Sequence, residues 1–499
     1  MIMDNMWQQD WVSKWALYSP EKTAIKEYET GKTISYSQLN EQANIYSHWL
    51  TKKYGLKSGS RIAVLSDYNI EYIILFCTAQ KTGFTLVPLN YRLAATEILH
   101  ILEESQPELV IFEEKYRHLL KDVSSGIFFT IEELVNVKHY NDPFPVTEVD
   151  ENHPIFILYT AGTTGLPKGV LYTHKMLFWN SINTAISLIV NTESRSINVM
   201  PPFHTGGWNV LLTPFLHHGG YTVLFRKFDP AAVLKFLQEE DITIFMGVPT
   251  MLQMMANLPE FDEARFPSLY YIIVGGEPMS IPLIEKWSSH GVAVRQGYGM
   301  TEVGPNLTSL HQSDSIRKKG SIGRPNFYVQ IKVVDEHGAE VQRGESGELW
   351  LRGPMVTPGY LNNPDGTTAA FSPDGKWFKT GDIIRVDEEN YIYVVDRVKN
   401  MYISGGENVY PAEVERVLIQ HPAVNECVII AVKHEKWGET GKACVSLTEG
   451  NTVTEQELID YCAQRLAKFK VPKSVVFLEE IPKTDAGKFD RKKLKSIYS

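Results

Sequence analysis

Glycine, threonine and a single lysine are concentrated in the twelve-residue segment 159–170, Tyr-Thr-Ala-Gly-Thr-Thr-Gly-Leu-Pro-Lys-Gly-Val. It follows an apolar run, 155–158, that has the length and β-branched content of a buried strand. A strand that ends in such a loop gathers backbone N–H groups, hydroxyls and an ammonium, which suits the oxygens of a polyphosphate. The candidate ligands are Thr160, Ala161, Gly162, Thr163, Thr164, Gly165 and Lys168.

Two other interpretations of this segment differ in strength. A Walker-type P-loop fails on spacing, because a motif counted from Gly162 needs glycine at position 167, which is proline here. An ordinary Gly/Thr surface turn is the remaining alternative, and it weakens as further motifs are found along the chain.

A second candidate segment is 296–302, Gln-Gly-Tyr-Gly-Met-Thr-Glu. An aromatic ring between two glycines offers a flat face that a planar base can approach closely. The hydroxyl of Thr301 and the carboxylate of Glu302 can reach a phosphate and its Mg²⁺, which prefers oxygen ligands. A Rossmann fingerprint is excluded because no later glycine has the required spacing. The alternative for Tyr298 is a packed core tyrosine.

The segment 201–208, Pro-Pro-Phe-His-Thr-Gly-Gly-Trp, contains a histidine and a tryptophan that suit a substrate pocket. His204 could be a metal ligand, a base or a satisfied polar group, and no second metal-binding residue is spaced to assist it. Trp208 could equally be a buried structural aromatic. Residues 199–220 contain no acidic residue, lysine or arginine. If this segment lines the substrate site, as the family resemblance described below implies, these absences favour a monocarboxylic acid with an apolar body.

Composition restricts the class of protein. The chain has 499 residues, 43% of them hydrophobic and 22% charged, with a net charge of −10. This acidic balance argues against a nucleic-acid partner and against binding to anionic membranes. The four cysteines show no metal-ligand spacing, and free thiols are expected. With neither a signal peptide nor a spanning segment in evidence, the sequence predicts a soluble, cytoplasmic protein.

The elements expected to position these residues alternate between strand and helix up to about residue 300. Strands are expected at 61–65, 86–88, 109–112, 197–200, 221–225, 242–246, 271–274 and 293–296, with helices at 70–81 and from 96. From about residue 321, strands at 329–334, 347–351, 383–386 and 391–395 indicate a small β-subdomain. After residue 400, the expected elements are helices at 411–419 and 455–468 and strands at 424–432 and 475–477.

These motifs, in this order, resemble the adenylate-forming superfamily, which contains acyl-CoA synthetases, firefly luciferases and the adenylation domains of peptide synthetases. The resemblance covers about residues 22–493. It implies an α/β fold: a large N-terminal domain (1–396) of parallel-rich sheets covered by helices, with a small β-subdomain (about 321–396), a hinge (397–400) and a mobile α+β C-terminal domain (401–499). One departure is Ala161, where serine is commoner in the family.

The resemblance also implies roles for individual residues. Tyr298 would lie against adenine, Thr301 on a phosphate, Thr160 and Glu302 at Mg²⁺, and Asp382 and Arg397 at the ribose. The loop 482–491 resembles the family's catalytic-lysine loop, which makes Lys488 catalytic together with His204, Thr301 and Glu302. The nucleotide site would also include Gly276, Glu277, Gln296, Gly297 and Gly299. The acyl site would include His204, Gly206, Gly207, Gly275 and Trp208, with the tryptophan as a gate.

The hinge and the CoA site follow from the same resemblance. Lys399 occupies the pivot position, and the segment 404–407 (Ser404, Gly405, Gly406 and Glu407) resembles the one that lines the pantetheine channel. Ile403 stands where some relatives have a second lysine, so one auxiliary charge is missing.

The activity implied is that of an ATP-dependent acid–CoA ligase that uses Mg²⁺ and forms an acyl-adenylate. The acid is predicted to be a medium- or long-chain fatty acid. The alternatives are an aromatic acid, or transfer of the acyl group to a carrier protein. A luciferase-like oxidation and a non-catalytic nucleotide-binding regulator are less favoured, and a homodimer is one assembly that the resemblance allows.

Overall fold

The computed structural model describes residues 9–123, 126–137, 140, 142–160, 167–404, 407–435, 437–484 and 488–498. The chain forms two compact units. The first unit comprises Met1–Gln330 and Arg352–Phe378, and the second comprises Ile331–Leu351 and Lys379–Ser499. This division groups most of the β-subdomain with the C-terminal residues, so the domain boundary at residue 396 stays a prediction.

The first unit contains two sheets that are mainly parallel. The larger sheet has the order β15-β14-β13-β12-β11-β9-β10-β1-β2 and the smaller one the order β6-β5-β3-β4-β7-β8. Antiparallel pairs occur at the sheet ends, including β7–β8 and β13–β14. The strands of the larger sheet are β1 (Thr23–Glu27), β2 (Thr33–Ser35), β9 (Arg195–Asn198), β10 (Tyr221–Leu224), β11 (Ile244–Gly247), β12 (Tyr271–Val274), β13 (Ala293–Met300), β14 (Gly304–Ser309) and β15 (Arg324–Pro325). Those of the smaller sheet are β3 (Arg61–Leu65), β4 (Thr85–Pro88), β5 (Leu109–Phe112), β6 (Ile127–Thr130), β7 (Pro154–Thr160) and β8 (Lys168–Thr173).

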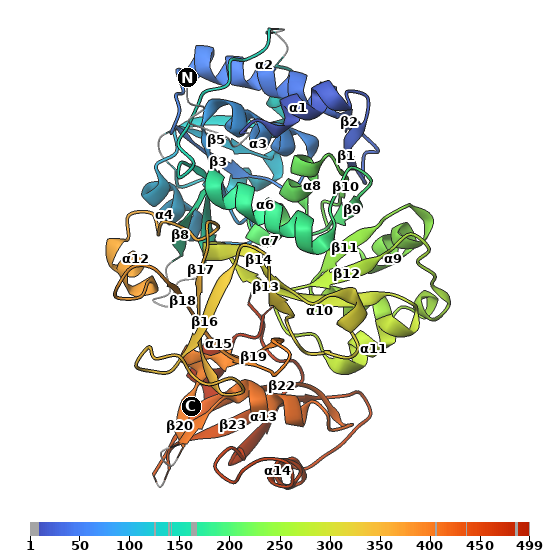
Figure 1. Ribbon diagram of the computed structural model, residues 1–499, viewed down its shortest axis with the longest axis vertical. Coiled ribbons are helices and arrows are strands. Elements are labelled where there is room, and N and C mark those ends of the chain that lie inside the picture. Colours follow the sequence, from blue (N-terminus) through green and yellow to red (C-terminus); the bar gives the residue numbers. More distant parts are fainter. Residues whose placement is uncertain are drawn as a thin grey trace. The chain divides into compact units, whose positions relative to one another are not determined.

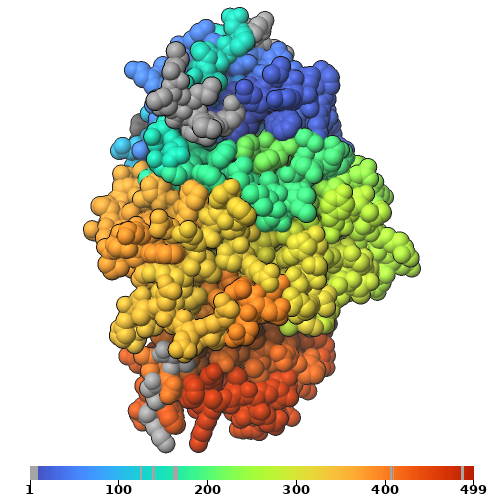
Figure 2. Space-filling model, viewed as in Figure 1, coloured from blue at the N-terminus to red at the C-terminus, as the bar shows by residue number. Residues whose placement is uncertain are grey.

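Helices cover these sheets, and their sequences show why they begin and end where they do. Every residue of α3 is buried; Asn69 caps its start by accepting from the Tyr72 N–H, and Gly83 ends it at φ 72°. Helix α6 packs on β14 (Figure 1) and lies at the surface in Figure 2. The α-helices are α1 (Trp11–Tyr18), α2 (Tyr36–Tyr54), α3 (Ile70–Thr82), α4 (Ala95–Ser105), α5 (Ile131–Leu134), α6 (His174–Leu188), α7 (Thr205–Asn209), α8 (Leu212–His218), α9 (Pro230–Glu239), α10 (Pro249–Ala256), α11 (Ile281–Ser289) and α12 (Pro364–Ala370). The 3₁₀-helices are η1 (Glu114–Leu120), η2 (Pro259–Glu263), η3 (Thr301–Val303) and η4 (Gln312–Asp314).

The second unit contains a four-stranded sheet and a five-stranded sheet. The first has the order β16-β17-β18-β19; the second has the order β21-β20-β23-β22, with β24 parallel to β23. Helix α13 packs on β22 (Figure 1). The strands are β16 (Gln330–Val334), β17 (Ser346–Arg352), β18 (Phe378–Val386), β19 (Ile392–Arg397), β20 (Tyr402–Ser404), β21 (Glu407–Val409), β22 (Val424–His434), β23 (Gly438–Leu447) and β24 (Ser474–Phe477). The helices are η5 (Val398–Asn400), α13 (Pro411–Leu418), α14 (Glu455–Ala463) and α15 (Arg491–Tyr498).

The α/β fold class and nearly all the expected elements are confirmed. Several expectations were incomplete: α14 ends at Ala463 rather than near residue 468, and no strand was predicted for β1, β2, β6, β8, β14, β15, β20, β21 or β23. Strand β23 contains Gly438 and Gly441, which weaken a strand signal. Gly441 is required by packing, because a Cβ there would lie 2.5 Å from the Tyr402 hydroxyl. Within the described ranges, no helix combines the length and apolarity needed to cross a membrane.

Candidate functional site

The glycine-rich segment begins and ends in a β-hairpin rather than leading into a helix. Strands β7 and β8 pair antiparallel, with Thr160 opposite Lys168, so the predicted hydroxyl and ammonium lie side by side. The predicted ligands at 161–166 lie outside the described residues. Among the described residues, no carboxylate lies within ion-pair distance of Lys168, whose Nζ instead lies 5.3 Å from the centre of the Tyr360 ring.

The segment 296–302 spans the end of β13 and the start of η3, and its residues are either buried or partly exposed. Gln296 is buried; its side chain accepts from the Met279 N–H (2.9 Å) and donates to the Ser321 carbonyl (3.3 Å). Its amide therefore braces the loop after β12, although the sequence predicted it at the nucleotide. Tyr298 is partly exposed, unlike the packed core tyrosine held as its alternative.

Of the glycines near the ends of β12 and β13, one is required by a close backbone contact and another has few neighbours. A Cβ on Gly299 would lie 2.2 Å from the Pro305 carbonyl oxygen, so the backbone there requires glycine. A Cβ on Gly275 would meet only the Gly297 carbonyl, at 3.7 Å, and Gly276 has φ 88°. A methyl group would therefore be tolerated at Gly275, which follows the carboxyl end of β12, and ligands of open α/β sheets bind at such strand ends.

Glu302 is held in place by two contacts from the segment 357–360. Its Oε1 accepts from the Tyr360 hydroxyl (3.0 Å), and its carbonyl accepts from the Thr357 N–H (2.8 Å). The side chain is largely buried, at 8% exposure. Burial and the neighbouring Glu302 carboxylate raise the pKa of Tyr360 well above its usual value. A fixed carboxylate is one of the oxygen donors that Mg²⁺ takes together with substrate phosphates, so this position of Glu302 is compatible with the predicted metal role.

The segment 201–208 forms the turn into α7 and places His204 at the helix N-cap. The His204 ring lies 4.6 Å from that of Phe203. A Cβ on Gly206 would meet only the Met200 Cε, at 3.7 Å, whereas one on Gly207 would lie 2.4 Å from the Pro201 carbonyl oxygen. Gly206 therefore leaves space beside His204, while Gly207 is required by packing.

Trp208 has the environment of a core residue. Its side chain is 0% exposed, and its Nε1 donates to the Pro202 carbonyl at 2.6 Å. Four aromatic rings lie with centroids 5.1–5.5 Å from it: Tyr68, Tyr72, Phe76 and Phe156. The structure thus shows the buried aromatic that the sequence analysis held as the alternative to a gate.

Arg295 was not predicted to matter and lies beneath the glycines of β13. It is 2% exposed and donates to the carbonyls of Leu310 and Ser187 and to the side chains of Gln312 and Ser309. With Gly297 it lines a cavity of about 10 Å³, the space of one water molecule. The only signal in the sequence for this buried polar cluster is the arginine that follows Ala293 and Val294 in β13.

In the second unit, the predicted ribose-binding pair is assembled. Asp382 on β18 and Arg397 on β19 are cross-strand partners, with Nε 3.0 Å from Oδ1. The carboxylate is buried (4% side-chain exposure), whereas the arginine side chain is 47% exposed. The strand register thus unites two residues that are fifteen positions apart in the sequence.

We expect Asp382→Ala to raise the KM for ATP far more than that for the acid. Removing a charged acceptor of hydrogen bonds from hydroxyls is worth about 1.5–3 kcal/mol, or about 10- to 150-fold. Initial rates at varied ATP and acid concentrations measure the effect. Glu388→Ala, in the exposed turn after β18, is the control. An ATP dependence equal to wild type would exclude the ribose contact.

The predicted hinge lies within the second unit, in η5, and is fastened by a residue that the sequence analysis missed. Asp396 accepts from the N–H groups of Arg397 (2.6 Å) and Ala412 (2.7 Å) and from the Asn400 side chain (3.1 Å). It thereby ties β19 and η5 to the first turn of α13. Burial and the nearby charges of Arg397 and Lys488 lower the pKa of Lys399. The Asp382 carboxylate acts in the opposite direction.

We expect Lys399→Pro to preserve pyrophosphate exchange and to slow transfer to CoA. Proline fixes φ and removes an N–H, which restricts rotation at a pivot. The two half-reactions are assayed separately, and Lys399→Ala, which removes the ammonium but leaves φ unrestricted, is the control. Equal rates of CoA transfer in the proline variant and wild type would place the pivot elsewhere.

The remaining predicted residues of this unit are only partly described. Lys488 lies close enough to Lys399 to lower its pKa, while 485–487 of the same loop lie outside the described residues. Ser404 is buried at the end of β20 and pairs with Glu407 at the start of β21. Gly405 and Gly406 lie outside the described residues. The CoA role of this turn stays a prediction.

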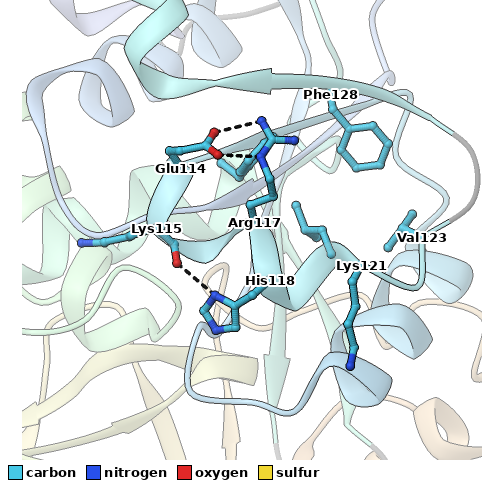
Figure 3. A pocket seen from close by; sticks show the side chains of 9 residues that line it. Glu114, Lys115, Arg117, His118, Lys121, Val123 and Phe128 are labelled. Carbon is cyan, nitrogen blue, oxygen red and sulfur yellow. Dashed lines mark hydrogen bonds and ion pairs between the residues drawn. The ribbon is translucent and has the colours of Figure 1, made fainter.

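A larger cavity is present in the first unit. It has a volume of about 680 Å³ and is formed by η1 with the ends of β5 and β6 (Figure 3). There the Arg117 guanidinium donates two hydrogen bonds to the Glu114 carboxylate, at 2.6 and 2.9 Å. None of the predicted site residues that the structure describes lines this cavity. The charge of Arg117 is balanced by the Glu114 carboxylate.

Comparison with known proteins agrees with the motifs. The family model of the AMP-binding enzymes matches residues 12–361, and that of the AMP-binding enzyme C-terminal domain matches 413–488. A feruloyl-CoA synthase from Amycolatopsis is 34% identical, covering 97% of this chain and 98% of its own. The long-chain-fatty-acid–CoA ligase FadD13 of Mycobacterium tuberculosis is 35% identical, with 97% of each chain covered.

A solved structure extends this likeness to the fold. The o-succinylbenzoate CoA synthetase MenE of Bacillus subtilis, in complex with ATP and magnesium ion, has a TM-score of 0.85 and 30% identity, covering 97% of this chain and 99% of its own. The chain belongs to the AMP-binding enzymes of the adenylate-forming superfamily, in the acyl-CoA synthetase branch.

Proposed function

We propose that this enzyme joins a carboxylic acid to CoA through an acyl-adenylate, with ATP and Mg²⁺. The observation that carries the proposal is that Lys168 and Glu302 both contact Tyr360, so the predicted phosphate-binding cation and the predicted metal-binding carboxylate lie at the same side chain. Bound Mg²⁺ would neutralise part of the triphosphate charge there.

The proposed reaction has two steps. The acid's carboxylate attacks the α-phosphorus of ATP, and pyrophosphate leaves. The CoA thiol then attacks the acyl carbon, and AMP leaves; hydroxide would be a far poorer leaving group from the acid itself. Lys488 stabilises the charge that develops in the first step, and the pivot at Lys399 withdraws it for the second.

We infer a compact, aromatic acid rather than the medium- or long-chain fatty acid that the sequence predicted. Trp208 is packed in the core, with four aromatic rings around it, so its side chain does not line an open tunnel. Between α6 and the sheet, an apolar cluster that includes Leu188, Phe215 and Met246 is in place. An alkyl tail would have to displace these packed side chains, whereas a compact ring needs less room, and few atoms crowd Gly206 and Gly275.

The experiment is a panel of acids assayed for pyrophosphate release with and without CoA. Benzoate- and cinnamate-type acids should have higher kcat/KM than octanoate and longer acids, and product should form only with CoA. A preference that rises with alkyl length would restore the fatty-acid assignment. Transfer to a phosphopantetheinyl protein in place of CoA would favour the carrier-loading alternative. The cytoplasmic location and a homodimer stay predictions from the sequence.

A further inference from the structure

Tyr360 contacts both charged residues of the predicted phosphate site. Its hydroxyl donates to the Oε1 of Glu302 at 3.0 Å, and its ring centre lies 5.3 Å from the Nζ of Lys168. The three residues come from three separate segments: the 357–361 segment, η3 and β8. No feature of the sequence around Tyr360 had pointed to this position.

The backbone around Tyr360 is fastened to β8 on both sides. The Leu361 N–H donates to the Gly169 carbonyl (2.7 Å), and the Leu171 N–H donates to the Gly359 carbonyl (3.1 Å). The N–H of Tyr360 itself donates to the Thr367 hydroxyl (3.0 Å). Because these bonds fix the main chain, the tyrosine ring has a defined position relative to Lys168.

The two contacts use different parts of the tyrosine. A cation is attracted to the face of an aromatic ring, whereas a carboxylate is attracted to the phenolic O–H. A tyrosine hydroxyl is protonated at neutral pH and can therefore donate to Glu302. Without this spacer, an ammonium and a carboxylate so close to one side chain would gain by pairing with each other.

We propose that Tyr360 is a positioning residue that keeps Lys168 and Glu302 apart and presents both to one magnesium-bound triphosphate. The proposal rests on the proposed function, since it assumes that ATP and Mg²⁺ bind here. Its hydroxyl acts on the metal side through Glu302, and its ring acts on the phosphate side through Lys168. Removing the hydroxyl and removing the ring should therefore have different consequences.

The test measures ATP binding by calorimetry at varied Mg²⁺ concentrations, without acid or CoA. In Tyr360→Phe the ring remains, so ATP binding without Mg²⁺ should equal that of wild type. The Mg²⁺ concentration for half-maximal enhancement should rise about tenfold, the effect of losing one hydrogen bond to a charged group. Tyr360→Leu should show the same shift and, in addition, weaken Mg²⁺-free ATP binding by about two- to fivefold, because the cation–π contact is lost.

Two controls separate positioning from general damage. Tyr116→Phe removes a similar bond, from the Tyr116 hydroxyl to Asp67 (2.8 Å), elsewhere in the same unit, and should leave the Mg²⁺ dependence unchanged. In a Glu302→Gln background, Tyr360→Phe should produce no further shift, because the hydroxyl acts through that carboxylate.

The outcomes are distinct. A Mg²⁺ dependence of Tyr360→Phe equal to wild type, an equal shift in Tyr116→Phe, or a full additional shift in the Glu302→Gln background would each overturn the positioning role. Failure of the wild-type protein to bind ATP at all would overturn the proposed function itself, and the inference with it.

Discussion

Lys488→Ala is expected to slow adenylation by about 10²- to 10³-fold, the usual loss when one preorganised electrostatic group is removed. The acid and the triphosphate are both anionic, and the lysine cancels that repulsion as the adenylate forms. In the second half-reaction the thiol attacks the uncharged acyl carbon of acyl-AMP, and no charge develops at a triphosphate, so its rate should be little affected. Pyrophosphate exchange measures the first step, and thioester formation from supplied acyl-AMP measures the second.

Lys483→Ala is the matched control for this experiment. Lys483 lies five positions before Lys488 and is ion-paired with Glu426 at 2.6 Å, so its charge is already used within the unit. We expect this variant to adenylate at a rate near that of wild type. Equal losses in both half-reactions of Lys488→Ala would assign the lysine a general structural role instead.

Trp208→Ala is expected to lower the stability of the first unit by about 3–5 kcal/mol, the range for deletion of a buried large aromatic side chain. The substitution leaves a cavity among four aromatic rings and removes the donor to the Pro202 carbonyl. Unfolding is followed by near-UV circular dichroism during heating, with the midpoint of the first unit as the measured quantity. Because losses of this size approach the stability of many domains, expression at low temperature is needed.

Trp179→Ala serves as the comparison, because Trp179 on α6 is only partly buried and makes an edge contact with Tyr328 at 4.7 Å. Its effect should be several times smaller. If Trp208→Ala instead kept the wild-type midpoint and altered the preference for acid chain length, the gate inferred from the sequence would be restored and the packing role would be wrong.

Local signals in the sequence predicted the α/β class and most strands. They also identified segments 159–170 and 296–302 as candidates for binding a nucleotide. The apolar run at 155–158 was correctly predicted as a strand, because burial on both faces of a sheet leaves a continuous hydrophobic stretch. The pairing of Asp382 with Arg397 was suggested by resemblance, and the β18–β19 register provides the contact. Strand β23 was missed because its glycines obscure the alternation that marks a strand.

The sequence by itself determined the chemistry that this chain has at its disposal: hydroxyls and a lysine after β7, a carboxylate after β13, and a lysine near the C-terminus. Only the tertiary structure decided which of these side chains touch a partner, and which are part of the core. Tyr360 contacts Glu302 and Lys168, Gln296 holds the loop after β12, and Trp208 packs on Tyr68 and Phe156, because each contact joins segments that are well separated in the chain. Periodicity and turn residues report the conformation of a few neighbouring residues, whereas strand order and crossovers decide which distant segments meet.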